Sequence, residues 1–344
     1  MPNDSQFNKE YGPRLGEITS EQFQEAFHRF GLGQFLAAEP ISTGLFGQNV
    51  FVTSTEGEFV LRGKCHYDWQ FPKERFIAQL LHEQTDVPIP WPYLLDPSTD
   101  IFGWSYIIMP RLPGLQLARF DVRGALFQKD KHGIAAAMGE TLALLHAATW
   151  LWTGEYSLRE DTITPLGMPY EEWIARGIHQ DIGTARKHSD RTTAADVAWV
   201  EQVLMRGWDA LGEDFTPTIV HHDFNYNNAV ANRIDSRWLI TGVFDLMEAY
   251  AGDPEADLCR LAAMYLDEDS ALARTYVQSY LRCRPPRAGF SERFPVYMLL
   301  DRLIVWSYAQ ANDVNWWDRS LTLREWAEPY ISAVSCMSCD GSPA

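Results

Sequence analysis

The sequence predicts an α+β fold in which a small, β-rich N-terminal lobe precedes a larger helical C-terminal lobe. Short runs rich in Val and Phe, at 48–53 and 58–62, indicate strands in the first part of the chain. From about residue 113 onward, apolar residues recur at helical spacing instead. The chain has 344 residues and 46% apolar content, which is enough for two cores. We therefore expect lobes at 1–112 and 113–344.

The small lobe is expected to begin with a helix. Thr19 and Gln22 form a capping box, and the apolar residues that follow, as far as Phe30, have helical spacing. Turn residues at 54–57 separate the two strands, which predicts a hairpin. Two further elements complete the expected lobe: a helix over 72–84 with Phe76, Leu80 and Leu81 on one face, and a strand over 104–109.

The large lobe is expected to be built on long helices. A stripe of Ile134, Met138, Leu142 and Leu145 predicts a helix over 131–148. The other elements expected here are a helix over about 193–211, helices beyond 255, and strands around 218–221, 228–232 and 238–244.

The chain is strongly acidic, with 46 Asp and Glu against 29 Lys and Arg and a net charge of −17. Such a surface repels nucleic acid and anionic membranes and attracts cations. We therefore expect no nucleic-acid partner and no membrane partner. The acidity either favours a polycationic substrate or only keeps the protein soluble, and the sequence leaves both readings open.

Nothing in the sequence predicts export or membrane insertion. No run of 18 apolar residues is present, and the N-terminus lacks the basic start and apolar stretch of a secretory signal. Five scattered cysteines are typical of a reduced, cytoplasmic protein. Cys336 and Cys339 form a C-x-x-C without a second pair, and their role stays open.

One polar segment carries residue types suited to phosphoryl transfer: His221-His222-Asp223-Phe224-Asn225-Tyr226-Asn227-Asn228. Asp223 is a carboxylate that could orient a hydroxyl nucleophile. Asn228 lies five residues later, and Asp245 lies 245 − 223 = 22 residues after Asp223. Amide and carboxylate oxygens suit Mg²⁺, which keeps several waters and takes one or two protein side chains. This order and spacing match a kinase catalytic loop and its downstream metal-binding Asp.

With these residues in place, the chain resembles the aminoglycoside phosphotransferase and choline kinase-like family, which shares the protein-kinase fold. The resemblance covers about residues 40–265. It implies a two-lobed protein-kinase-like fold, with nucleotide bound by the lobe at 1–112 and the acceptor by the lobe at 113–344. The matching blocks are Phe59-Val60-Leu61-Arg62, Pro72-Lys73-Glu74-Arg75, Val87-Pro88-Ile89-Pro90, Tyr106-Ile107-Ile108-Met109 with Gly114, Leu142 to His146, the 221–228 loop, Phe244-Asp245, and Gly252-Asp253-Pro254 with Asp257-Leu258.

The chain departs from the family pattern in three places. Arg62 stands where lysine is common, and Lys64, expected on the same strand face, is the alternative phosphate-binding cation. An arginine can still pair with phosphate, often bidentately. His222 stands where the family usually has Gly. The loop at 42–49 is not G-x-G-x-x-G but resembles the family's shorter Ser/Gly…Asn turn.

The resemblance implies a role for each candidate residue. Asp223 is expected to act as the catalytic base, and Asn228 and Asp245 to complete the catalytic set by holding Mg²⁺. Glu74 is expected to pair with Arg62, and His221 to brace the loop by hydrogen bonding. Asp253 and Asp257 are expected to cap and brace the helix that follows. The residues expected to bind the nucleotide, ATP or GTP, are Arg62, Glu74, Gly44, Gln48, Asn49, Met109 and Arg111.

The implied activity is Mg²⁺-dependent transfer of the γ-phosphate to a hydroxyl group of a small molecule. Resemblance and negative charge together favour a cationic aminoglycoside-type antibiotic, hygromycin among the candidates, and hence a role in antibiotic resistance. Choline, an amino alcohol or a sugar are alternative acceptors. A nucleotide-binding pseudokinase scaffold is the alternative from another class of function.

A Trp-rich stretch near the end of the sequence is expected either to pack in the core, which we favour, or to form a wall of the acceptor site. Its residues are Trp306, Trp316, Trp317 and Trp326.

Overall fold

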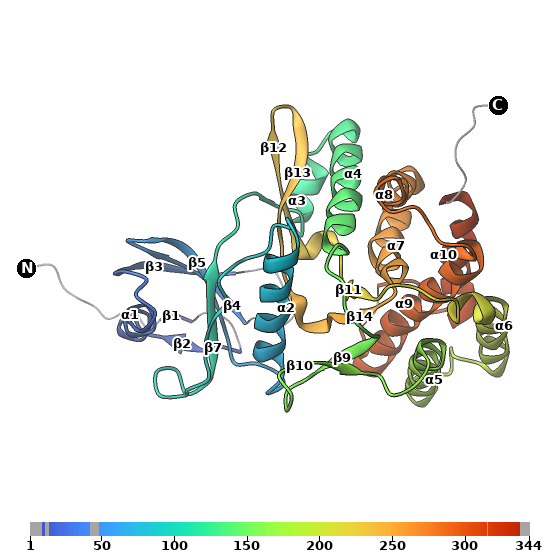
Figure 1. Cartoon of the computed structure of the whole chain (residues 1–344), viewed down its shortest axis with the longest axis horizontal. Helices are drawn as coiled ribbons and strands as arrows, with labels where there is room; N and C mark the ends of the chain where they lie inside the picture. Colours follow the sequence, from blue (N-terminus) through green and yellow to red (C-terminus); the bar gives the residue numbers. More distant parts are fainter. Residues whose placement is uncertain (1–8, 11–13, 42–47, 315, 338–344) are drawn as a thin grey trace, which may run out of the picture. The chain divides into compact units, whose positions relative to one another are not determined.

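The computed structural model describes residues 9–10, 14–41, 48–314 and 316–337. The chain divides into two compact units (Figure 1). The first takes the chain through Leu126, together with Tyr156–Thr162 and Tyr226–Glu248. The second takes Phe127–Glu155, Ile163–Asn225 and the chain from Ala249 onward. The lobes expected at 1–112 and 113–344 remain a sequence-based division.

The first unit is rich in strands. Its elements, in chain order, are β1 (Lys9–Glu10), β2 (Glu17–Ile18), α1 (Ser20–Arg29), β3 (Phe35–Pro40), β4 (Asn49–Ser54), β5 (Gly57–Gly63), α2 (Gln70–Gln84), β6 (Leu94–Asp96), β7 (Tyr106–Pro110), β8 (Leu115–Gln116), α3 (Phe120–Gly124), the 3-10 turn η1 (Tyr226–Asn228), β12 (Ala229–Ile234), β13 (Arg237–Val243) and the 3-10 turn η2 (Leu246–Glu248).

The second unit is mainly helical. Its elements are α4 (Gln128–Leu145), α5 (Tyr170–His188), α6 (Ala194–Leu211), β11 (Thr218–Val220), β14 (Tyr250–Gly252), the 3-10 turn η3 (Pro254–Asp257), α7 (Leu258–Glu268), α8 (Ser270–Cys283), α9 (Phe290–Asn312) and α10 (Leu323–Met337). Strands β9 (Gly154–Ser157) and β10 (Thr162–Pro165) are divided between the units. Their outer residues belong to the second unit, whereas Tyr156–Thr162, which contains the connecting loop and the adjoining strand residues, belongs to the first.

A five-stranded antiparallel sheet in the order β3-β4-β5-β7-β6 organises the first unit. The predicted hairpin is confirmed, because β4 pairs with β5 and Ser54 faces Gly57 across the turn. Gly57 has φ of 137°, a conformation that glycine adopts at little cost. Strands β12 and β13 form a second hairpin, seen near the top of Figure 1, and β8 pairs with β12.

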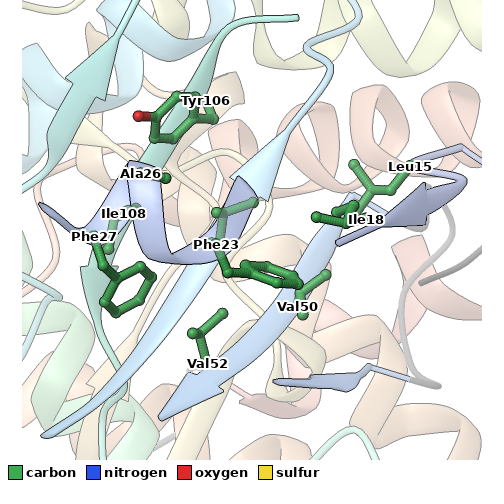
Figure 2. Close-up of a cluster of buried hydrophobic side chains, with 10 residues drawn as sticks. Leu15, Ile18, Phe23, Ala26, Phe27, Val50, Val52, Tyr106 and Ile108 are labelled. Carbon is green, nitrogen blue, oxygen red and sulfur yellow. The ribbon is translucent and has the colours of Figure 1, made fainter. Parts of the chain in front are cut away.

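Helix α1 covers the core of this unit. The predicted capping box is confirmed: Thr19 Oγ1 accepts from the Gln22 amide at 3.2 Å, and Gln22 Oε1 accepts from the Thr19 amide at 2.9 Å. Phe23 and Phe27 on this helix are buried against Val50 and other sheet residues (Figure 2). Burying each such side chain contributes about 1.5–3 kcal/mol, so apolar contact fixes the helix on the sheet.

The prediction for α2 is correct in position, and its three apolar residues differ in burial. Leu80 and Leu81 are buried as expected, whereas Phe76 is only half-buried. The ring of Phe76 instead lies 5.7 Å from that of Tyr156. The buried face includes Glu74, which is 0% exposed. A pattern based on apolar spacing could not place a buried carboxylate, because burying a charge requires a partner elsewhere in the fold.

The helices of the second unit pack closely. In α4 the stripe of Ile134, Met138, Leu142 and Leu145 is buried, as predicted. Helix α4 packs against α8 at Gly139, where an added Cβ would lie 2.3 Å from the Tyr276 carbonyl oxygen. Helix α9 contacts α5, α6, α7 and α10. None of the helices formed by the described residues has the length and hydropathy needed to cross a bilayer.

The Trp-rich stretch forms core packing around α9, as the sequence favours. Trp306 is 0% exposed and its ring stacks 5.1 Å from that of Trp317. Trp326 on α10 lies 4.2 Å from Trp317. Trp316 differs, because 55% of it is exposed.

Candidate active site

A buried ion cluster forms in the first unit between β5, α2 and the segment after β13. Arg62 on β5 lies 3.3 Å from Glu74 Oε2 through one terminal nitrogen and 3.1 Å from Asp245 Oδ1 through the other. The expected Arg62–Glu74 ion pair is therefore present. The cluster contains two carboxylates for one guanidinium group.

The pKa values in this cluster reflect that imbalance. Burial raises the pKa of Glu74 to about 7, and the Arg62 guanidinium only partly opposes this rise. Burial also disfavours the charge on Arg62, but the Glu74 and Asp245 carboxylates outweigh it and keep the pKa of Arg62 above its ordinary value. Arg62 therefore stays charged, and its single guanidinium group does not neutralise both carboxylates.

Asn228 and Asp245 lie at the same end of the β12–β13 hairpin. Ala229 pairs with Val243 at this end, and the Phe244 amide donates to the Asn228 carbonyl at 3.1 Å. Asp245 follows directly with φ of 69°, a left-handed conformation unusual for a residue other than glycine. Its side chain is 29% exposed, whereas Asn228 is 9% exposed. An amide and a carboxylate are therefore presented together in the first unit.

In the second unit, the loop that carries Asp223 is fixed by Asp257. One Asp257 oxygen accepts from the His221 amide at 2.5 Å and the other from the His222 amide at 2.7 Å. His146 Nε2 lies 3.1 Å from Asp257 Oδ2. Burial would raise the pKa of Asp257, but its hydrogen bonds, first the one to His146, hold the pKa below its ordinary range. The sequence prediction of a bracing role for Asp257 is supported.

Asp223 sits beside a small pocket of the second unit. Its side chain is 38% exposed, and its Oδ1 accepts from Asn225 Nδ2 at 3.0 Å. Its amide donates to His221 Nδ1 at 3.3 Å, which is the loop-bracing contact expected of that histidine. The pocket is lined by residues that include His222, Tyr250, Asp257, Arg260, Tyr297 and Asp301. A partly exposed carboxylate can accept a proton from a hydroxyl group that lies within hydrogen-bond reach.

His222 is held in a strained conformation at this pocket. Its φ is 68°, and its ring meets the Tyr250 ring edge-on at 5.3 Å. Residues other than glycine pay about 1–2 kcal/mol for a left-handed backbone. The loop therefore still forms with His222 in place of the family's usual Gly. The substitution adds an imidazole to the pocket wall.

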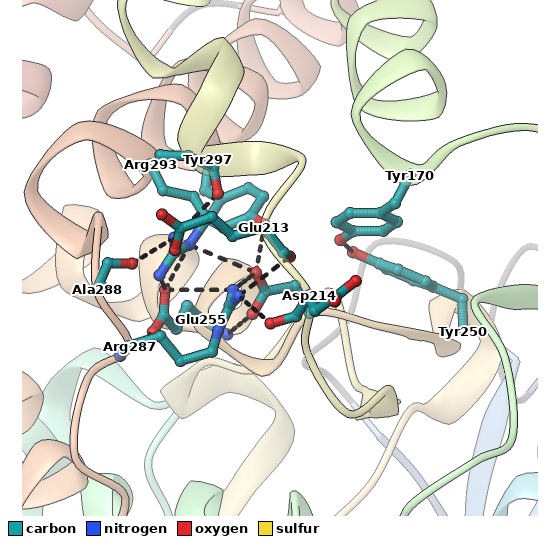
Figure 3. Close-up of polar contacts among 11 residues, drawn as sticks. Tyr170, Glu213, Asp214, Tyr250, Glu255, Arg287, Ala288, Arg293 and Tyr297 are labelled. Atoms are coloured by element: carbon teal, nitrogen blue, oxygen red, sulfur yellow. Dashed lines mark hydrogen bonds and ion pairs between the residues drawn. The ribbon is translucent and has the colours of Figure 1, made fainter.

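A second buried polar network supports the segment after β14 (Figure 3). Asp253 accepts from the Glu255 amide at 3.0 Å and from the Tyr297 hydroxyl at 2.6 Å, and it pairs with Arg287. Arg293 is fully buried and donates to Glu255 at 2.5 and 2.8 Å. These contacts support the capping role predicted for Asp253 and anchor the start of α7.

Two predicted nucleotide-binding residues have other partners in the first unit, and a third is buried. Gln48 is buried, and its side-chain amide donates to the Lys64 carbonyl at 2.8 Å. Arg111 lies 3.9 Å from the Phe51 ring and 3.4 Å from Glu58. Met109 is buried in β7.

Of the other candidates in this region, one begins a described strand and another lies outside the described residues. Asn49 begins β4, and Gly44 lies outside the described residues. Lys64 does not share the strand face of Arg62, because β5 ends at Gly63 and Lys64 turns away with φ of 54°. That expectation was wrong, since strand alternation applies only within the strand.

Sequence reasoning missed two polar residues of the second unit near Asp223. Arg260 on α7 contacts Asp223, and Asp301 on α9 contacts Arg260. One signal was available, because Arg260 comes just after the family block, three residues beyond Asp257, and i, i+3 residues share a helix face. Asp301 within the apolar run of α9 was a second signal, since buried acidic residues are usually paired.

Comparison with known proteins places the chain in a family. The family model described as the phosphotransferase enzyme family (APH) matches residues 37–290, well over half of the chain. The chain belongs to this family. No curated protein sequence matches it.

Solved structures of similar fold cover nearly the whole chain. An aminoglycoside phosphotransferase, a thermostable mutant of APH(4)-Ia in complex with ADP and hygromycin B, has 18% identity and a TM-score of 0.64 and covers 92% of this chain and 98% of its own. APH(2")-IIIa with GDP and kanamycin has 14% identity and a TM-score of 0.59, covering 93% and 99%. A protein assigned as a fructosamine-3-kinase from Haemophilus somnus 129PT has 14% identity and a TM-score of 0.57, covering 93% and 97%.

These findings confirm two sequence predictions. The chain has the two-lobed, kinase-like α+β fold of these structures. As a member of the phosphotransferase enzyme family, it is a small-molecule phosphotransferase.

Proposed function

We propose that this phosphotransferase moves the γ-phosphate of ATP or GTP, with Mg²⁺, to a hydroxyl group of a small cationic molecule. The observation that carries the proposal is the surplus carboxylate of the first unit. Arg62 faces both Glu74 and Asp245, and Asn228 lies at the same hairpin end as Asp245. A negatively charged cluster with an amide oxygen beside it suits a divalent cation.

The donor set of this hairpin end fits magnesium. Asn228 and Asp245 supply one amide and one carboxylate oxygen, and Mg²⁺ commonly takes one or two protein side chains while keeping several waters. The bound ion would neutralise charge on the phosphate oxygens during transfer. Arg62, fixed by Glu74, is the cation that we assign to the nucleotide phosphates. The assignments of Gly44, Gln48, Asn49, Met109 and Arg111 to nucleotide binding stay predictions.

Asp223 is the residue that we assign to the acceptor. The acceptor hydroxyl donates its hydrogen bond to the Asp223 carboxylate, which orients the oxygen and takes its proton. A bond forms from that oxygen to the γ-phosphorus, the bond from the γ-phosphorus to the bridging oxygen breaks, and the nucleoside diphosphate leaves. A positioned base contributes about 10²–10⁴ in rate.

The net charge of −17 supports a cationic acceptor. Two proteins of the same fold were solved with an aminoglycoside bound, hygromycin B in one and kanamycin in the other. We therefore favour an aminoglycoside-type acceptor. The likeness to a protein assigned as a fructosamine-3-kinase makes a sugar-linked amine the second candidate. The solved relatives carry ADP or GDP, so both nucleotides belong in the test.

The test is product analysis by mass spectrometry. Purified protein is incubated with Mg²⁺, ATP or GTP, and a panel of aminoglycosides, amino alcohols, choline and sugar amines. We expect a mass increase of one phosphoryl group on an aminoglycoside, absent with Asp223→Asn. A product only on a sugar amine would select the second candidate. No phosphorylated product from any compound would refute the proposed function.

A further inference from the structure

Arg260, a residue with no role in the proposed chemistry, bridges two carboxylates of the second unit. Its Nε lies 3.4 Å from Asp223 Oδ1 and 3.0 Å from Asp301 Oδ1. The arginine side chain is 18% exposed, and Arg260 and Asp301 both line the pocket beside Asp223. The bridge therefore joins a carboxylate of the loop to one inside the helical core.

Asp301 is itself firmly held. Arg302 donates to Asp301 Oδ2 at 2.9 Å through Nε and at 2.5 Å through a terminal nitrogen. The Arg302 guanidinium lies 5.4 Å from the Trp326 ring and 4.9 Å from the Tyr330 ring, both on α10. Both Arg302 donors meet the same oxygen, so they hold Oδ2 in place. The other oxygen, Oδ1, is left to Arg260.

Asp223 needs such an anchor. It lies in a loop with 38% of its side chain exposed, so without contacts it would sample several rotamers. A base acts only when it is within hydrogen-bond reach of the proton that it removes. A displacement of about 1 Å in a catalytic constellation can cost about 10²-fold in rate. Fixing the Asp223 carboxylate is therefore worth more to catalysis than to folding.

We propose that Arg260 is a positioning residue for the base, and that α9 and α10 anchor it through Asp301 and Arg302. The inference rests on the proposed function, in which Asp223 receives the acceptor hydroxyl. Arg260 acts through Asp223, so its loss should lower kcat and leave the KM values for nucleotide and acceptor nearly unchanged.

The experiment compares Arg260→Met, Arg260→Lys, Arg260→Ala, Asp301→Asn and Asp223→Asn, with Arg324→Met as the matched control. Arg324 is an exposed arginine of α10 paired with Glu328. We expect kcat to fall about 10- to 100-fold in Arg260→Met, less in Arg260→Lys and Asp301→Asn, and not at all in the control. Added ethylguanidinium should partly restore kcat in Arg260→Ala, which a purely structural role would not allow.

A double variant decides whether Arg260 acts through the base. If it does, Arg260→Met adds little to the loss already caused by Asp223→Asn. A multiplied loss, or wild-type kcat in the folded Arg260 variants, would overturn the inference. Circular dichroism checks folding, and if Arg260→Met is unfolded, Arg260→Lys and Asp301→Asn decide the outcome. Absence of turnover in the wild type would instead refute the proposed function, and this inference with it.

Discussion

The two units hold similar charged groups in different ratios. In the first, the guanidinium group of Arg62 faces both Glu74 and Asp245. In the second, Arg260 and Arg302 face Asp223 and Asp301, so the cations equal the carboxylates. The difference indicates a division of labour. The first cluster has negative charge left over for an incoming cation, whereas the second is balanced and holds a carboxylate in place.

The pKa shifts of the two buried carboxylates express the same contrast. Burial raises the pKa of Glu74 to about 7, because a single guanidinium shared with Asp245 does not offset it. Burial also favours the neutral form of Asp301. There, however, Arg260 and Arg302 outweigh it and hold the pKa of Asp301 below its ordinary range. Both carboxylates are buried, so the opposite directions reflect how far the neighbouring charges offset burial: Asp245 adds to the rise at Glu74, whereas two guanidinium groups act on Asp301.

The largest expected effect comes from removing the surplus charge at the hairpin end. Asp245→Asn should lower kcat/KM for the magnesium nucleotide by more than about 100-fold. Substituting a residue that only hydrogen-bonds to a metal ligand typically lowers metal affinity or activity by about 10- to 100-fold, and a ligand itself should matter more. Steady-state kinetics across a Mg²⁺ titration measure it. Asp235→Asn, in the turn at the other end of the same hairpin, is the control and should behave as wild type. Equal kcat/KM in the two variants would contradict the assignment.

A smaller effect is expected from Glu74→Gln, which equalises the charges of the first cluster. Arg62 loses the carboxylate that holds it in place. We expect kcat to fall about 10-fold, because a misplaced phosphate-binding cation stabilises the transition state less well.

The stability of the protein should also depend on pH through Glu74. The native pKa of Glu74, about 7, lies above its unfolded value of 4.5, so the native state holds the proton more tightly. The wild type should therefore lose stability relative to Glu74→Gln as pH rises from about 4.5 to 7, as measured by urea midpoints of metal-free protein.

Asp301→Asn should show the opposite pH dependence. The native pKa of Asp301 lies below its ordinary value of 3.8, so the charged carboxylate stabilises the fold above that pH. The stability advantage of the wild type over Asp301→Asn should be full at neutral pH and shrink as pH falls below about 3.8. Urea midpoints across this range test it. A constant difference between the two proteins would remove the electrostatic explanation.

The smallest effect concerns backbone strain. Ser236 in the β12–β13 turn has φ of 68°, the same value as His222 at the pocket. Ser236→Gly should raise the free energy of unfolding by about 0.5 kcal/mol. The substitution relieves the strain of the left-handed backbone, but glycine loses more conformational entropy on folding, and the two effects partly cancel.

His222→Gly should raise the free energy of unfolding by a similar amount. It should also raise the acceptor KM, because it removes an imidazole from the pocket wall. An unchanged acceptor KM would show that the imidazole has no part in acceptor binding.

Local patterns in the sequence predicted most elements of the fold. The capping box at Thr19, the hairpin turn before Gly57 and the stripe on α4 depend on neighbours in the chain. Lys64 was misplaced because the strand ends one residue earlier, which alternation does not reveal. Several elements were not predicted individually: helices α3 and α5 and strands β1, β2, β3, β6, β8, β9, β10 and β14.

Only those site residues that belong to a recognisable sequence motif could be predicted from the sequence. Asp223, Asn228 and Asp245 stand at family spacing, and the Arg62–Glu74 pair followed from the resemblance. The Arg260–Asp301 contact joins residues 301 − 260 = 41 positions apart on two helices. No single sequence shows that these helices bring the two side chains together, because the contact depends on tertiary packing.

The most direct test of this division of labour measures nucleotide binding and turnover in the same two variants. Calorimetry follows binding of the magnesium complex of a non-hydrolysable nucleotide, and product analysis follows turnover. We predict that Asp223→Asn binds the magnesium nucleotide as the wild type does but turns over about 10²–10⁴ times more slowly, whereas Asp245→Asn loses both. Wild-type turnover by Asp223→Asn, or undiminished magnesium-nucleotide binding by Asp245→Asn, would contradict the account.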